Sequence, residues 1–119
     1  MKIRDASQYF EALQNLTVTD HEFSVRTGLK IIQNKNKLKS ELDSYFELRN
    51  EAILKYSDGT GEIDAKVNPK QFQECRQYVQ ELENEDVVIE FNKIKLSELE
   101  NIQLPLKTIQ ALSFMIEED

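Results

Sequence analysis

The chain is poor in residues that break helices, form disulfides or bind metals. Its 119 residues include two prolines, three glycines, one histidine, one cysteine and no tryptophan. A lone cysteine excludes an intrachain disulfide, and no apolar run approaches the ~20 residues that span a bilayer. The N-terminus lacks the apolar stretch of a signal peptide, so we expect neither secretion by that route nor a membrane partner. The length and the 39% hydrophobic content predict a single domain over residues 1–119.

Few residues suggest chemistry. His21 follows a helix-start signal and has too few neighbouring donors for a metal site. Cys75 lies on the apolar side of a predicted helix, which is typical of a buried, inert thiol. Three scattered glycines cannot build a phosphate-binding loop. We therefore assign no catalytic, cofactor-binding or metal-binding residue, and we expect that the protein is not an enzyme.

The most informative segment is Asp20–Ser57, which contains no proline and one glycine and keeps the apolar spacing of a helix. As a helix it would be roughly 55 Å long. Thr19 and Glu22 fit a capping box, and Val18 and Phe23 fit the hydrophobic staple around it. We therefore predict that the helix begins directly after Thr19. Part of a helix this long must project, pack on a second helix or pack on another subunit, and the chain ends are candidates to cover it.

A second helix is predicted after a turn. Asp58-Gly59 ends the long helix, and Asn68 with Pro69 and Gln71 repeats the helix-start signal. The second helix is expected to run to about Asn84. Because the connection is short, the two helices should form an unequal antiparallel hairpin.

The chain ends are expected to supply short helices and a small β-sheet. One helix should run from Asp5 to about Leu16, and another should start at Pro105 and extend to Ile116. Asp86–Phe91 alternates as a strand does. Further strand candidates are Glu62–Val67, Ile94–Leu96 and Ile102–Leu104. The predicted fold class is α+β, mainly α: an unequal antiparallel helical hairpin, short N- and C-terminal helices and a small β-sheet.

Charge is unevenly distributed along the chain. Residues 1–57 carry nine basic and eight acidic residues, whereas residues 58–119 carry six and fourteen. The uncovered part of the long helix is a candidate interaction surface: Val25, Arg26, Leu29, Lys30, Ile32, Lys37 and Leu38. A candidate acidic surface comprises Glu81, Glu83, Glu85 and Asp86. Nucleic acid is not the expected ligand, since the chain is acidic and no aromatic residues alternate with the basic ones. The basic stretch of the long helix, which contains Arg26, Lys30, Lys35, Lys37 and Lys39, is instead a solvated helix face or a contact to a second copy.

The order of elements resembles that of small uncharacterised proteins of tailed bacteriophages. The resemblance is carried by the helix ending in Lys55-Tyr56, the Asp58-Gly59 turn, the acidic strand and the Ile94-Lys95-Leu96-Ser97-Glu98-Leu99 stretch. It implies a bacterial cytoplasmic or virion location, with no cofactor and no known activity. Two functions are then expected. One is a virion assembly subunit that docks through its long helix, to itself or to another protein. The alternative is an acidic inhibitor of a basic surface on a host enzyme or defence protein.

Overall fold

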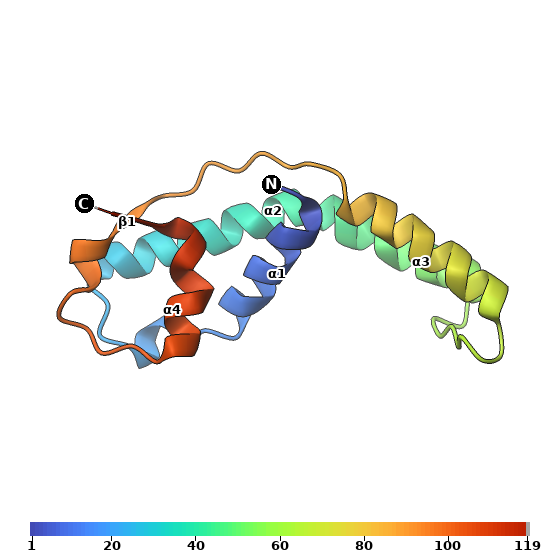
Figure 1. Cartoon of the computed structure of the whole chain (residues 1–119), viewed down its shortest axis with the longest axis horizontal. Coiled ribbons are helices and arrows are strands. Elements are labelled where there is room, and N and C mark those ends of the chain that lie inside the picture. Colours follow the sequence, from blue (N-terminus) through green and yellow to red (C-terminus); the bar gives the residue numbers. More distant parts are fainter. Residues whose placement is uncertain (119) are drawn as a thin grey trace.

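The computed structural model describes residues 1–118 and shows an elongated molecule of 53 × 26 × 18 Å built around one long helix (Figure 1). Helices dominate, and the only sheet among the described residues has two very short strands. In chain order the elements are α1 (Ile3–Gln14), η1 (Val18–Asp20), α2 (Val25–Tyr56), α3 (Pro69–Glu83), β1 (Ile94–Lys95), η2 (Leu96–Leu99), α4 (Leu106–Leu112), η3 (Ser113–Met115) and β2 (Ile116–Glu117). The predicted class, α+β and mainly α, is confirmed.

The long helix α2 begins later than predicted. Ser24 is its N-cap, and the Ser24 Oγ accepts a hydrogen bond from the Thr27 N–H at 3.1 Å. The prediction that Thr19 caps this helix is wrong, because Thr19 lies inside the 3₁₀ turn η1. That turn brings Val18 against α2, so that a Cβ on Gly28 would lie 3.3 Å from the Val18 Cγ1. Glycine at position 28 therefore permits a close contact that alanine would crowd.

The predicted end of α2 is confirmed. The helix stops at Tyr56, and Asp58 and Gly59 both adopt positive φ angles, of 54° and 85°. The Gly59 N–H donates to the Leu54 carbonyl at 2.7 Å, which satisfies one of the last free carbonyls of the helix. The Asp58-Gly59 pair thus reverses the chain, and α3 then lies beside the C-terminal half of α2 (Figure 1).

The start of α3 agrees with prediction in position but not in mechanism. Pro69 is the first residue of α3 and Asn68 is its N-cap. The Asn68 side chain makes no capping hydrogen bond, so the predicted box with Gln71 does not form. The fixed φ of proline and the backbone bond from the Phe72 N–H to the Asn68 carbonyl (3.0 Å) are sufficient to start the helix.

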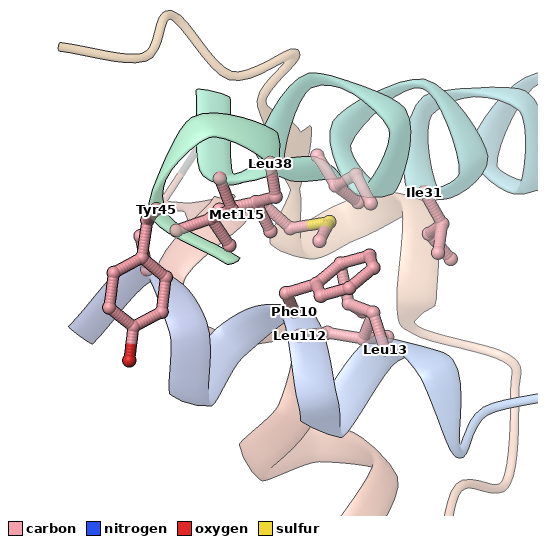
Figure 2. Close-up of a cluster of buried hydrophobic side chains, with 10 residues drawn as sticks. Phe10, Leu13, Ile31, Leu38, Tyr45, Leu112 and Met115 are labelled. Atoms are coloured by element: carbon pink, nitrogen blue, oxygen red, sulfur yellow. The ribbon is translucent and has the colours of Figure 1, made fainter. Parts of the chain in front are cut away.

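The chain ends cover the N-terminal half of α2. Figure 2 shows Phe10 and Leu13 of α1 facing Ile31 and Leu38 of α2, with Met115 between the helices. These contacts form one continuous core, which α4 and η3 complete. Its buried residues are Ala6, Phe10, Leu13, Ile31, Leu38, Leu42, Tyr45, Ile94, Leu112 and Met115. The terminal segments of the chain therefore cover much of the α2 surface for which the predicted hairpin left no partner.

The predicted terminal helices have different bounds in the structure. α1 begins at Ile3, before Asp5, and ends at Gln14. α4 ends at Leu112, so the prediction of a helix reaching Ile116 is wrong. Ile116 instead pairs in parallel with Ile94, and this places β2 beside β1. Ending the helix early lets η3 turn Met115 into the core, where it is fully buried.

Most of the predicted strands do not form. Residues 86–91 are extended, but apart from the isolated bridge of Asp86 to Lys2 they pair with no strand of the described chain. Their alternation has another cause: Val87, Ile89 and Phe91 pack on the core, while Val88 is 86% exposed. The stretches 62–67 and 102–104 are also not strands. Of the predicted strands, only Ile94–Lys95 is in the sheet.

Candidate docking surface and a second groove

The extended segment 86–93 is held on α2 by polar side chains of the basic stretch. The Asn34 amide, which is fully buried, accepts from the Asn92 N–H (2.7 Å) and donates to the Asn92 carbonyl (2.9 Å). The Lys37 Nζ donates to the Glu90 carbonyl at 2.8 Å. The Gln33 Oε1 accepts from the Asn92 Nδ2 at 2.6 Å. These side chains of the basic stretch therefore bind another segment of the same chain.

Lys30 is also occupied within the chain. Its Nζ lies 3.1 Å from the Glu98 Oε1, in a partly exposed ion pair that joins α2 to η2. Burial alone would raise the pKa of Glu98, but the hydrogen bonds from Lys30 and from the Lys95 N–H together lower it. The expected intermolecular role of Lys30 is thus replaced by an intramolecular one.

An apolar surface remains at the N-terminal end of α2. Val25, Leu29 and Ile32, which we call the docking face, are 83%, 56% and 41% exposed. They line a groove of about 780 Å³ whose other wall includes Val18 and Phe23. Positions i, i+4 and i+7 lie on one side of a helix, so the three side chains form a continuous apolar stripe.

The remaining residues of the predicted interaction surface divide into two groups. Leu38 is fully buried in the core, so its assignment to a surface is wrong. Arg26 is exposed beside the docking face, and Lys35, which was not part of the predicted surface, lines the groove. The predicted surface therefore reduces to three apolar side chains with flanking basic residues.

The predicted acidic residues gather around the C-terminal end of α3. Glu81, Glu85 and Asp86 are exposed, whereas Glu83 is half-buried. The Glu83 Oε1 accepts a hydrogen bond from the Tyr45 hydroxyl at 3.1 Å. Burial raises the pKa of Tyr45; the Arg49 guanidinium opposes this rise and the Glu83 carboxylate reinforces it. Three of the four carboxylates are thus available to a partner.

The structure separates the two residues considered for chemistry. His21 lines the groove of the docking face, where its ring meets the ring of Phe23 at 5.6 Å between centroids. Cys75 is buried and lines a different groove, and burial raises the pKa of its thiol. Among the described residues, no group of three His, Cys, Asp or Glu side chains could hold a metal. The part of the chain that the structure describes also contains no helix with the length and apolar character needed to cross a membrane.

That second groove, of about 580 Å³, lies between α2 and α3 and was not predicted. Arg49 and Arg76 line it together with apolar side chains that include Ile53 and Phe72. We call it the interhelical groove. A signal for it exists in the sequence, because Arg49 interrupts the apolar stripe of the long helix at a position where an apolar residue is expected.

Comparison of the chain with protein-family models, with characterised proteins and with solved structures finds no match. The phage resemblance therefore stays a prediction, and the functional argument depends on the surfaces described above.

Proposed function

We propose that this protein is a non-enzymatic interaction subunit that docks a protein partner on the docking face of α2. The exposure of Val25, Leu29 and Ile32 carries this proposal. Single exposed apolar side chains are ordinary, but a stripe of three beside an apolar groove is typical of a surface that binds protein. The partner is a second copy of the chain or another protein, and the phage resemblance makes a virion component, or a host protein in the bacterial cytoplasm, the expected one.

The available burial is sufficient for a transient contact. Covering the exposed parts of the three side chains would contribute about 3–4 kcal/mol, before contacts on the opposite wall of the groove. Arg26 and Lys35 flank the stripe, so a partner helix with an apolar face and acidic margins would complement it. The acidic half of a second copy offers such margins.

The test compares two leucines of the same helix. Leu29 is 56% exposed on the docking face, and Leu54 is 51% exposed elsewhere on α2. Changing Leu29→Ser should weaken self-association or partner binding about tenfold, because the exposed half of the leucine side chain no longer contributes apolar area that the partner buries. Leu54→Ser should leave binding unchanged. Sedimentation velocity measures self-association, and quantitative pull-down with both variants measures a different partner.

The proposal would be contradicted if the protein is a monomer and neither variant loses a protein that the wild type binds. Salt distinguishes the alternative, an acidic inhibitor acting through exposed Glu81, Glu85 and Asp86. Binding through those carboxylates should weaken steeply as ionic strength rises, whereas apolar docking should change little. Loss of binding in Glu81→Gln with retention in Leu29→Ser would support the alternative instead.

A further inference from the structure

We infer that the interhelical groove binds a small amphipathic carboxylate, with its head group at Arg49 and Arg76 and its apolar tail towards the connection between α2 and α3. This site lies on a different part of the molecule from the docking face, and it does not depend on the function proposed above. The groove has the size of pockets that hold small ligands, about 300–1,000 Å³.

The two arginines are the first observation. The protein carries a net charge of −7, yet neither Arg49 nor Arg76 forms an ion pair within residues 1–118. Lys30, by contrast, is paired with Glu98. The Arg49 guanidinium lies 5.1 Å from the centroid of the Phe46 ring and 5.5 Å from that of Tyr45. It also interacts with the Tyr45 hydroxyl, which donates to Glu83, but it forms no ion pair with a carboxylate of residues 1–118. Guanidinium groups bind carboxylates through paired hydrogen bonds, so the head group has a matching site.

Polarity along the groove is the second observation. Arg76 and Gln80 lie one turn apart on α3, and Phe72 lies one turn before Arg76. Beyond Phe72 the groove is lined by Ile53 of α2 and by Ile63 of the connection between the helices. From Gln80 to Phe72 the helix rises roughly 12 Å, which is the length available to the head group and the acyl chain together. The part of the groove lined by Arg49 and Arg76 is therefore cationic, Glu83 lies beyond Gln80, and the opposite end is apolar.

A carboxylate within the groove sets the orientation of the ligand. Glu83 lines the end beyond Gln80, where the Tyr45 hydroxyl donates to it. It would repel an anion placed there, so the head group is confined to the space between Arg49 and Arg76. The tail must then extend away from Glu83, towards Phe72 and Ile63.

Decanoate is the probe, with decanol and butyrate as controls for the head group and the tail. Backbone amide signals of an isotopically labelled protein are followed during titration below the concentration at which decanoate aggregates. Decanoate should shift Ile63, Phe72 and Val79 in a saturable manner and bind about tenfold more tightly than decanol, because only the carboxylate engages charged donors. Butyrate should bind more weakly than decanoate, since it leaves the apolar end empty.

The variant Arg76→Gln should weaken decanoate binding about tenfold without changing decanol binding. Arg76 is exposed, so the variant is expected to fold, and a thermal melt checks this. Arg4→Gln, which removes an exposed arginine from α1, is the matched control and should change neither ligand. Equal affinities for decanoate and decanol, or shifts at Val25 and Leu29 in place of those in the interhelical groove, would overturn the inference.

The only cysteine of the chain provides an independent readout. Cys75 lines the groove and is 7% exposed. Decanoate at a concentration that just saturates the wild type should slow its alkylation by iodoacetamide, and should slow it clearly less in Arg76→Gln at the same ligand concentration. A neutral reagent is required, because a carboxylate-bearing one would itself bind the arginines. An unchanged alkylation rate in the wild type would count against a ligand in this groove.

Discussion

Replacing Asn34 by alanine should destabilise the protein far more than the size of the side chain suggests. Asn34 is fully buried, and its amide is the partner of both the N–H and the carbonyl of Asn92. Asn34→Ala leaves two backbone groups without partners, at a cost of about 3 kcal/mol. The better helix propensity of alanine returns about 0.5 kcal/mol. The net loss of about 2–3 kcal/mol is substantial against the roughly 6–18 kcal/mol expected for a chain of this length.

Asn36 offers a matched control two residues further along α2. It is exposed, so Asn36→Ala makes the same chemical change without removing a buried amide, and its stability should stay within about 0.5 kcal/mol of the wild type. Urea unfolding followed by circular dichroism measures both variants. Thermal unfolding should show a decrease of about 10 °C for Asn34→Ala alone. Amide hydrogen exchange adds a local test, since the Asn92 N–H should be protected in the wild type and exchange faster in the variant. Equal stabilities of the two alanine variants would refute the role assigned to Asn34.

Three further changes have defined outcomes. Leu38→Ala should cost about 2–5 kcal/mol in urea unfolding because Leu38 is fully buried, whereas Leu54→Ala should cost under about 1 kcal/mol. Because the pKa of Glu98 is lowered, its ion pair with Lys30 stabilises the protein above the pKa of an unfolded glutamate and is lost as pH falls through the lower folded value. Glu98→Gln should therefore flatten the acid side of the stability-versus-pH profile, by no more than about 1 kcal/mol. Because burial raises the pKa of Cys75, its alkylation at mildly alkaline pH should be slower than that of free cysteine. The rate of alkylation should continue to rise at pH values where the rate of free cysteine has already levelled off.

Local signals predicted the features of the fold that are decided locally. The end of α2 follows from Asp58 and Gly59, whose positive φ angles suit few other residues. The start of α3 follows from Pro69, whose ring fixes φ whether or not Asn68 caps the helix. The burial of Cys75 likewise follows from its place on the apolar side of one helix.

Features that depend on distant parts of the chain were not predictable. Thr19 and Ser24 both precede helix-forming residues, but Thr19 lies in the turn η1, which brings Val18 close to Gly28, and Ser24 caps the helix. The alternation of apolar and polar positions in residues 86–91 is the same for a strand and for an extended segment whose odd-numbered residues pack on a core. The contacts of the segment with the rest of the chain distinguish the two arrangements, among them the packing of its side chains on the core and the bonds of Asn34 to Asn92.

The basic stretch of α2 shows why surface function is harder to predict than secondary structure. Lys30 and Lys37 were assigned to an interaction surface because they lie on the part of the long helix that was expected to be uncovered, yet their partners are Glu98 and the Glu90 carbonyl, more than fifty residues away. A backbone carbonyl leaves no trace in the sequence pattern, so a lysine that binds one cannot be told from a free lysine. Exposed apolar residues are more informative, because apolar side chains are stabilised by burial and not by contact with solvent. The exposure of Val25 and Leu29 in a chain that covers Ile31 and Leu38 on the same helix therefore supports a docking role more strongly than the charges do.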